Sequence, residues 1–225
     1  MMRDTPALIK STGCFEKDFP FFISRDRIDG YVELHQHDFV EIEYTVSGRG
    51  SERVNGLAHP LSAGNLTVLF PWDCHDLQAD PGEALCFFKI NMDIELFMVN
   101  TSPLYKLRKI PFGEVSRFSH VLFCDERYEE ILSLFRRLEE EFDRESPYRE
   151  MLFYVKVAEI LMEFDLARSA PVSERQDEAD SVWKVVSFIH QNYSRELDGP
   201  KTAATFRCSY ERMNALLREH TGMDF

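Results

Sequence analysis

The sequence predicts an α+β protein with an N-terminal β-barrel, a helical hairpin and a small C-terminal helical unit. Three observations support this fold class. Short β-prone runs separated by glycines fill residues 21–92, the hydrophobic period changes from two to 3.6 residues after Pro111, and a polar segment precedes a second helical region. A chain of 225 residues is long enough for a medium domain and a small one, each with its own core.

The barrel is predicted over residues 1–112 from six runs with strand character. These runs are FFIS, YVEL, VEIEYTV, SERV, LTVLF and LCFFKI. Six or more strands at this spacing form a sandwich or a barrel. Alternation along residues 40–44 places Glu41 and Glu43 on one face of their strand and three apolar side chains on the other. We therefore expect one apolar face and one face that carries carboxylates.

A helical hairpin is predicted over residues 113–168. Its first helix has a single apolar stripe, whereas the second, over about residues 147–167, has two stripes on opposite sides. One stripe contains Met151, Val155, Ala158 and Met162, and the other contains Phe153, Val157, Ile160 and Phe164. A helix with two apolar faces needs two partners. Either it is central to its own domain, or it covers the barrel with one face and a second copy of the chain with the other. We expect the second arrangement, and with it a homodimer.

Residues 169–180 are polar, contain a proline and lack periodicity, so they predict an interdomain linker. The chain has no run of about 18 apolar residues and no signal-peptide pattern, which predicts a cytoplasmic protein without a membrane partner. Its five cysteines are scattered and form no Cys-x-x-Cys pair, as is usual for reduced thiols.

The formal net charge of -13 argues against non-specific nucleic-acid binding by the whole surface. The charge is unevenly distributed, however. Residues 181–225 carry 6 Lys and Arg and 5 Asp and Glu, a balance of +1, which leaves -14 for residues 1–180. Only the near-neutral C-terminal part is therefore suited to contact a polyanion.

The densest chemistry lies in two motifs, Gly30-x4-His35-Gln-His37-x3-Glu41-x6-Gly48 and Gly64-x6-Pro71-x3-His75. In a strand His35 and His37 point the same way, and Glu41 joins them if the strand is continuous. Three imidazoles and a carboxylate suit Zn, Fe, Mn or Ni.

This spacing resembles the two motifs of the cupin superfamily. The resemblance implies a small barrel over about residues 15–95 whose mouth holds a metal or a small ligand. The expected effector pocket consists of His35, His37, Glu41, His75, Tyr31 and Trp72. A divalent metal, if one binds, would be held by the first four, although we expect a metal-free pocket and no cofactor. The first spacer is one residue short, and Trp72-Asp73 stand where the second motif often has a glycine.

Residues 181–225 predict three helices, with Ser209 capping the last of them, which is the layout of a helix-turn-helix. The phrase Ile189-His190-Gln191-Asn192-Tyr193 and the ending Thr221-Gly222-Met223 resemble the first helix-turn-helix of the AraC family of bacterial transcription regulators. The order of barrel, hairpin and this unit is also that family's architecture. The resemblance implies DNA contacts from Arg207, Ser209, Tyr210, Glu211, Arg212, Asn214 and Arg218.

The C-terminal unit departs from the family pattern in several ways. Gly199 and Thr202 replace usual leucines, Arg207 replaces a small turn residue, and Ala215 stands where a base-contacting arginine is common. These changes predict a weakened second helix and weak DNA binding. The family's DNA-binding domain has two such units over about 100 residues, so residues 181–225 would be an incomplete domain: a fragment, or a regulator with one reading head.

We therefore expect an effector-responsive, DNA-binding transcription regulator of the AraC type, not an enzyme, with a small-molecule effector, DNA and a second copy of itself as partners. Two alternatives stay open. One is a metal-dependent cupin enzyme, an isomerase or dioxygenase, using His35, His37, Glu41 and His75. The other is a DNA-incompetent partner that titrates longer relatives by dimerising with them.

Overall fold

The computed structural model describes residues 6–10, 15, 19–112, 119–144, 146–168, 185, 188–189, 192, 196–221 and 224–225. The chain divides into two compact units, one of residues Leu8–Ala170 and one that joins Met1–Ala7 to Pro171–Phe225. The linker predicted at 169–180 lies outside the described residues. Within the described part, no helix is both long and apolar enough to cross a membrane.

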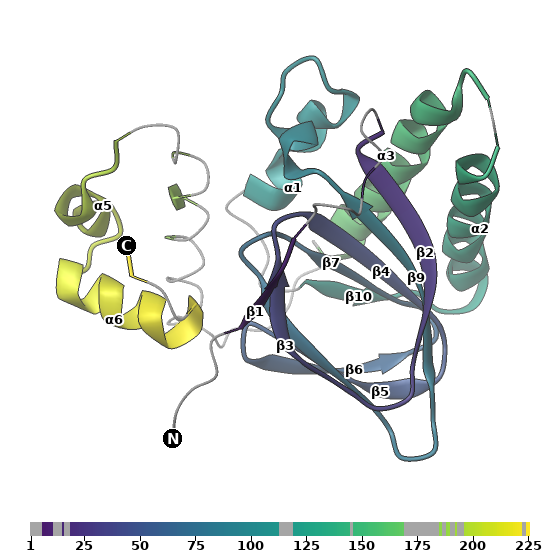
Figure 1. Ribbon diagram of the computed structural model, residues 1–225, viewed down its shortest axis with the longest axis horizontal. Helices are drawn as coiled ribbons and strands as arrows, with labels where there is room; N and C mark the ends of the chain where they lie inside the picture. Colours follow the sequence, from purple (N-terminus) through teal and green to yellow (C-terminus); the bar gives the residue numbers. More distant parts are fainter. Residues whose placement is uncertain are drawn as a thin grey trace. The chain divides into compact units, whose positions relative to one another are not determined.

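The larger unit is built on two five-stranded sheets that face each other (Figure 1). In spatial order the first sheet contains β1 (Ala7–Ile9), β3 (Tyr31–His37), β8 (Cys74–Ala79), β5 (Arg49–Val54) and β6 (Leu57–Ser62). The second contains β10 (His120–Leu122), β7 (Asn65–Leu69), β4 (Val40–Ser47), β9 (Leu85–Met92) and β2 (Phe21–Ile28). Together with the helices, these sheets confirm the predicted α+β class and its cupin-like barrel.

All six sequence runs lie in strands, but four further strands were not predicted from the sequence. β6 contains Pro60, which a strand tolerates at the edge of a sheet, where β6 lies. β8 carries His75 and Asp76 next to each other, so that it lacks an apolar run. β10 falls within the range expected to be wholly helical, and it pairs with β7 in the second sheet.

The alternation predicted along β4 is confirmed. On its apolar face Tyr44 stacks on Phe135 of α2 (Asp125–Phe142), with ring centroids 5.1 Å apart, and its hydroxyl donates a hydrogen bond to the Tyr128 carbonyl. Glu41 and Glu43 lie on the opposite face, between the two sheets, where each is only 2% exposed. Both faces of β4 are therefore buried, one under a helix and the other inside the barrel.

The hairpin consists of α2 and α3 (Arg149–Arg168), which lie on the same side of the second sheet (Figure 1). The stripe of α3 that contains Phe153 and Val157 is fully buried, and the Phe153 ring lies 4.4 Å from that of Phe21 on β2. Val155 and Met162, on the other stripe, are 52% and 46% exposed. One of the two apolar faces thus covers the barrel and the other has no partner among the described residues.

Three short helices connect β9 to the segment before β10. They are η1 (Ile94–Phe97), η2 (Pro103–Leu107) and α1 (Lys109–Phe112). Arg168, at the end of α3, donates a hydrogen bond to the Ile110 carbonyl in α1. This hydrogen bond links the last turn of α3 to α1.

In the smaller unit, α5 (Gly199–Thr205) and α6 (Tyr210–Thr221) are described in full. Asp198 caps α5 by accepting a hydrogen bond from the Lys201 amide at 3.0 Å, and Pro200 lies in the first turn, where a proline is tolerated. Ser209 accepts a hydrogen bond from the Arg212 amide at 3.1 Å, so its predicted capping role is confirmed.

Two departures in this unit have structural explanations. A Cβ at Gly199 would lie 2.4 Å from the Tyr210 ring, so glycine allows α5 and α6 to pack closely. Gly199 therefore contributes to helix packing, although glycine lowers the helix propensity of α5. Arg207 has a φ of 55° in the turn between the helices, a conformation that costs a non-glycine residue about 1 kcal/mol. Of the first predicted helix, only Val185, Phe188, Ile189 and Asn192 are described.

Candidate functional site

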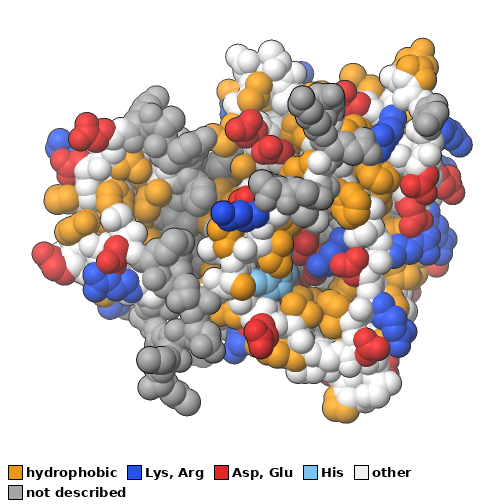
Figure 2. All heavy atoms as spheres, in the orientation of Figure 1, with side chains coloured by type: hydrophobic (Ala, Val, Ile, Leu, Met, Phe, Trp, Pro, Cys, Tyr) orange, Lys and Arg blue, Asp and Glu red, His pale blue; other side chains and the backbone are white. Residues whose placement is uncertain are grey.

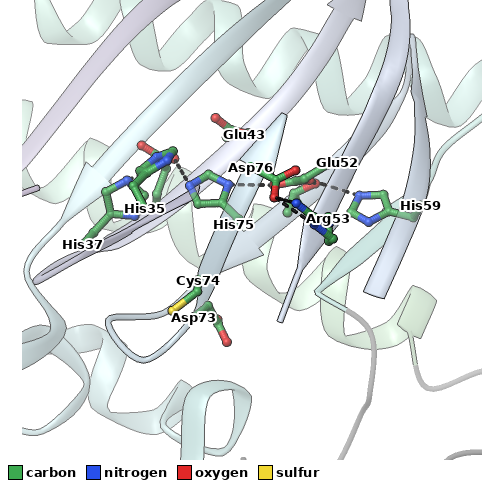
Figure 3. A network of polar contacts seen from close by, with 12 residues as sticks. His35, His37, Glu43, Glu52, Arg53, His59, Asp73, Cys74, His75 and Asp76 are labelled. Carbon is green, nitrogen blue, oxygen red and sulfur yellow. Dashed lines mark hydrogen bonds and ion pairs between the residues drawn. The ribbon is translucent and has the colours of Figure 1, made fainter. Parts of the chain in front are cut away.

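The three motif histidines converge inside the barrel (Figure 3). His35 and His37 project from β3 and His75 from the neighbouring β8, and the ring centroids of His35 and His75 lie 4.2 Å apart. Cross-strand pairing sets this arrangement, because His35 lies directly opposite His75 in the β3–β8 ladder. Ligating atoms of the three rings lie within 4.8 Å of one another.

Glu41 completes the cluster by a different route from the one expected. The strand is not continuous: β3 ends at His37, and β4 starts at Val40 in the other sheet. The Asp38–Phe39 turn therefore carries the chain between the sheets, so that Glu41 faces the histidines across the barrel. Its Oε1 lies 3.8 Å from Nε2 of both His37 and His75.

The hydrogen bonds of two histidines determine where their lone pairs point. Nδ1 of His35 lies 2.8 Å from the Glu33 carbonyl oxygen, and Nδ1 of His75 lies 2.9 Å from Oε1 of Glu52. Both partners are acceptors, so both Nδ1 atoms carry the proton. In the neutral rings Nε2 is then an unprotonated donor atom that can coordinate a metal.

Glu52, on β5, was missed in the sequence analysis because it lies outside both motifs. Besides His75 it accepts a hydrogen bond from the Thr67 hydroxyl at 3.0 Å, and it lies 3.0 Å from Nε2 of His59. Burial opposes ionisation of this carboxyl, but the contacts with His59 and His75 outweigh burial and lower the pKa of Glu52 to about 2. Glu52 is therefore a buried, ionised carboxylate between two histidines.

Glu43 and Lys89 were also missed, and they form the wall beside Glu41. Lys89 Nζ lies 2.9 Å from Glu43 Oε1 and 3.4 Å from Glu41 Oε2. Burial raises the pKa of Glu43 to about 7, whereas Lys89 and the histidines keep that of Glu41 below its usual value despite its burial. Because Lys89 already neutralises carboxylates, it is poorly placed to receive an anionic ligand.

Protonation differs among the three motif histidines. Burial lowers the pKa of His37 to about 3, and burial with the nearby charge of His75 also lowers that of His35. Burial acts in the same direction on His75, but its hydrogen bond to Glu52 and the charges of Glu52, Glu43 and Glu41 outweigh burial and raise its pKa. His35 and His37 are thus neutral ligands at physiological pH, and a metal at His75 would compete with a proton.

Several buried polar atoms in the described part of the chain have no hydrogen-bond partner, and many of them belong to this cluster. They include His37 Nδ1, Glu41 Oε1, Glu43 Oε2, His75 Nε2 and Asn91 Oδ1. Leaving such atoms unpaired costs free energy, so the set calls for a ligand that accepts electron pairs or donates hydrogen bonds. The donor set of His35, His37, His75 and Glu41 therefore fits a divalent transition metal.

Two expected pocket residues lie away from this cluster. Tyr31, at the start of β3, is 53% exposed, and Trp72 is buried with its ring 5.4 Å from Phe70. The neighbouring Asp73 explains the missing glycine of the second motif, because it accepts hydrogen bonds from the Phe70 amide and the Asn55 side chain and so holds the turn before β8.

An apolar group of side chains packs inside the barrel. Leu61, Leu77, Ala79, Leu85 and Phe87 form one contiguous core group. Histidine atoms, in pale blue, are visible near the middle of the face shown in Figure 2, among hydrophobic side chains.

The residues implicated in DNA contact lie on or next to α6. Arg207, Ser209, Glu211, Arg212 and Arg218 are exposed, and Tyr210 and Asn214 are half-buried. Arg218 pairs with Asp224, Asn214 accepts a hydrogen bond from the Phe225 amide, and Ser209 accepts one from the Arg212 amide. The side chains of Arg207, Arg212 and Glu211 are exposed.

His120, on β10, provides a test of the buried histidine network. Its ring stacks on His59 at 3.5 Å, and burial, with the charge of His59, lowers its pKa to about 4. In the unfolded chain the pKa of His120 is near 6.5, so this imidazole is protonated at a higher pH there than in the folded protein. The contribution of the neutral imidazole to the free energy of unfolding is therefore fully present above pH 6.5 and is lost as the pH falls toward 4. We expect His120→Phe, which keeps a flat ring, to be stabilised relative to the native protein by about 1 kcal/mol more at pH 5.5 than at pH 8. Urea unfolding at both pH values measures this; an equal difference at both would contradict it.

The two-sheet barrel, its buried histidine cluster and the covering helical hairpin define a ligand-binding cupin-type domain. The family described as AraC-like ligand binding domain matches residues 20–152, more than half of the chain. The protein therefore belongs to this family. Comparison with curated proteins gave no match.

The chain is similar to several solved structures, and ToxT shares its fold over most of its length. ToxT from Vibrio cholerae is 14% identical with a TM-score of 0.50, and the match covers 92% of this chain and 78% of ToxT. A cupin protein from Bacteroides fragilis is 22% identical over 33% of this chain and 64% of that one, with a TM-score of 0.29. A predicted oxalate decarboxylase from Thermotoga maritima is 25% identical over 32% of this chain and 66% of that one, with a TM-score of 0.31.

Proposed function

We propose that this protein is an effector-responsive transcription regulator of the AraC type. The observation that carries the proposal is one chain holding both an AraC-like ligand-binding domain, over residues 20–152, and a C-terminal pair of helices with helix-turn-helix spacing. ToxT, an AraC-family regulator, shares the fold over most of the chain, which supports the same order of parts. We place the protein in the cytoplasm, where it meets DNA.

In this proposal the barrel is a sensor and not a catalyst. A small ligand binds at the histidine and carboxylate cluster, α2 and α3 hold two copies together, and α6 contacts DNA. Ligand binding alters DNA affinity only if the ligand binds the DNA-competent arrangement with a different affinity from the others. The hairpin packs directly on the sheet that carries Glu41 and Glu43, so the site and the proposed dimer contact share one sheet.

DNA binding is expected to be weak for residues 181–225, because their charge balance is only +1. The test is fluorescence anisotropy with duplexes tiled across the region upstream of the protein's own gene, at 50 and 200 mM salt. We expect micromolar affinity at low salt and a steep loss at high salt. Arg212→Ala should weaken binding to every duplex and reduce the salt dependence by about one phosphate contact.

Arg137→Ala is the matched control, since it removes the same charge from the exposed face of α2. It should leave the affinity unchanged. Absence of binding at 50 mM salt, or equal losses in the two variants, would argue against DNA recognition through α6 and favour a protein that acts only by dimerising with relatives.

A further inference from the structure

We propose that Glu52 is a positioning residue that makes His75 a ligand for a divalent transition metal in the barrel. The inference rests on the proposed sensor function and deepens it, because it adds a positioning residue outside both sequence motifs to the metal ligands that the cupin resemblance implies. The metal would be held by His35, His37, His75 and Glu41, whose donor atoms converge as described above.

Glu52 is placed by contacts from three neighbouring strands. It projects from β5 and is 1% exposed, and it meets His75 from β8, Thr67 from β7 and His59 from β6. Figure 3 shows its carboxylate between the rings of His75 and His59. Each carboxylate oxygen has at least one donor within 3.0 Å, so the group is fully engaged in this one orientation.

This arrangement controls which nitrogen of His75 faces the cavity. Oε1 of Glu52 lies 2.9 Å from Nδ1 of His75 and accepts its hydrogen bond, so the proton is on Nδ1 and Nε2 is directed toward Glu41 Oε1, 3.8 Å away. That Nε2 has no hydrogen-bond partner among the described residues. A carboxylate behind a metal-ligating imidazole fixes its tautomer and orientation and increases its basicity.

His35 is oriented in the same way by a backbone carbonyl, that of Glu33. Two of the three imidazoles are therefore held with Nδ1 protonated and Nε2 facing the cavity before any ligand binds. A metal-ligating imidazole usually donates its other N–H to a carboxylate or a backbone carbonyl, which is the arrangement of both rings here.

The test measures Co²⁺ binding to the full chain and to its Glu52→Gln and Asp76→Asn variants. Binding is monitored by visible absorption at pH 8. The two oxygens of Glu52 accept hydrogen bonds from His75 and Thr67, and glutamine offers only one acceptor oxygen in their place, so its NH₂ group must face one of them. We expect Glu52→Gln to weaken Co²⁺ binding by about 10- to 100-fold and to change the absorption spectrum of the bound ion.

Asp76→Asn is the matched control. Asp76 is a buried carboxylate next to His75 in β8, but it lies on the opposite face of the strand and pairs with Arg53. Its substitution removes the same charge and should leave affinity and spectrum unchanged. Equal effects of the two variants, or native affinity in Glu52→Gln, would overturn the assignment, as would failure of the native protein to bind Co²⁺.

If Glu52→Gln does not fold, a second measurement on the native protein tests how His75 coordinates the metal. In the native protein loaded with Zn²⁺, ¹⁵N NMR of the imidazoles should show His75 bound through Nε2 and protonated at Nδ1. Ligation through Nδ1, or an unligated His75, would overturn the proposal. Neither experiment involves DNA, so a failed metal assignment leaves the regulator function standing and is distinguishable from a failed DNA-binding test.

Discussion

Replacing both Val155 and Met162 with lysine is expected to give a folded monomer in place of a dimer. These residues belong to the stripe of α3 that faces away from the barrel, together with Met151, and Leu166 beyond it is 72% exposed. An apolar strip of this length on a helix is usual where a second subunit packs. Lysines there would have to be desolvated in the dimer, so we expect the dissociation constant to rise by about 100-fold or more.

The same substitutions on the opposite stripe should have a different result. Val157 and Ile160 lie on the face of α3 that packs against the barrel, and both are fully buried. Lysines at these positions cannot reach water unless α3 moves away from the barrel. We expect this variant to lose its fold. Sedimentation velocity and circular dichroism on both variants separate the outcomes, and a native protein that is already monomeric at micromolar concentration would show that the outer stripe is not a dimer contact.

Replacing Gly48 with alanine should destabilise the barrel by about 3 kcal/mol or more. Gly48 connects β4 to β5 with a φ of 91°, and a Cβ there would lie 2.0 Å from the Ala84 carbonyl oxygen. The closing glycine of the first motif is therefore needed for two reasons, a left-handed backbone and a backbone neighbour that cannot move aside. Chemical unfolding of the variant measures the loss.

Gly56→Ala is the control for this prediction. Gly56 has a similar φ of 81°, but nothing lies within 4 Å of the position its Cβ would occupy. Only the conformational cost applies there, about 1 to 2 kcal/mol. Equal destabilisation by the two substitutions would contradict the view that close approach of the backbone requires Gly48.

The sequence was most informative where a local rule applies to every residue of an element. Period-two alternation correctly separated Glu41 and Glu43 from the apolar face of β4, and the 3.6-residue period correctly found both apolar faces of α3. The motif spacing brought His35, His37, Glu41 and His75 together, as the structure confirms. The roles of these residues stay predictions until a ligand is tested.

The less predictable elements are those with little local signal. β8 and β10 are short or polar and become strands because β3, β5 and β7 offer free edges for pairing. Likewise, nothing in the local sequence marks Glu52, since a single glutamate in an alternating strand is usually solvated. It becomes notable only when closure of the barrel buries it against residues from three other strands.

Periodicity in the sequence thus predicted the class of fold, and the resemblance to the two cupin motifs predicted the residues of the histidine cluster. Only the tertiary structure decided which face of α3 is covered, how Glu41 reaches the histidines from the other sheet, and that Glu52 and Lys89 belong to the site. These features depend on which strands become neighbours when two sheets close on each other. That is a long-range choice, governed by the burial of whole faces, and no short stretch of sequence records it.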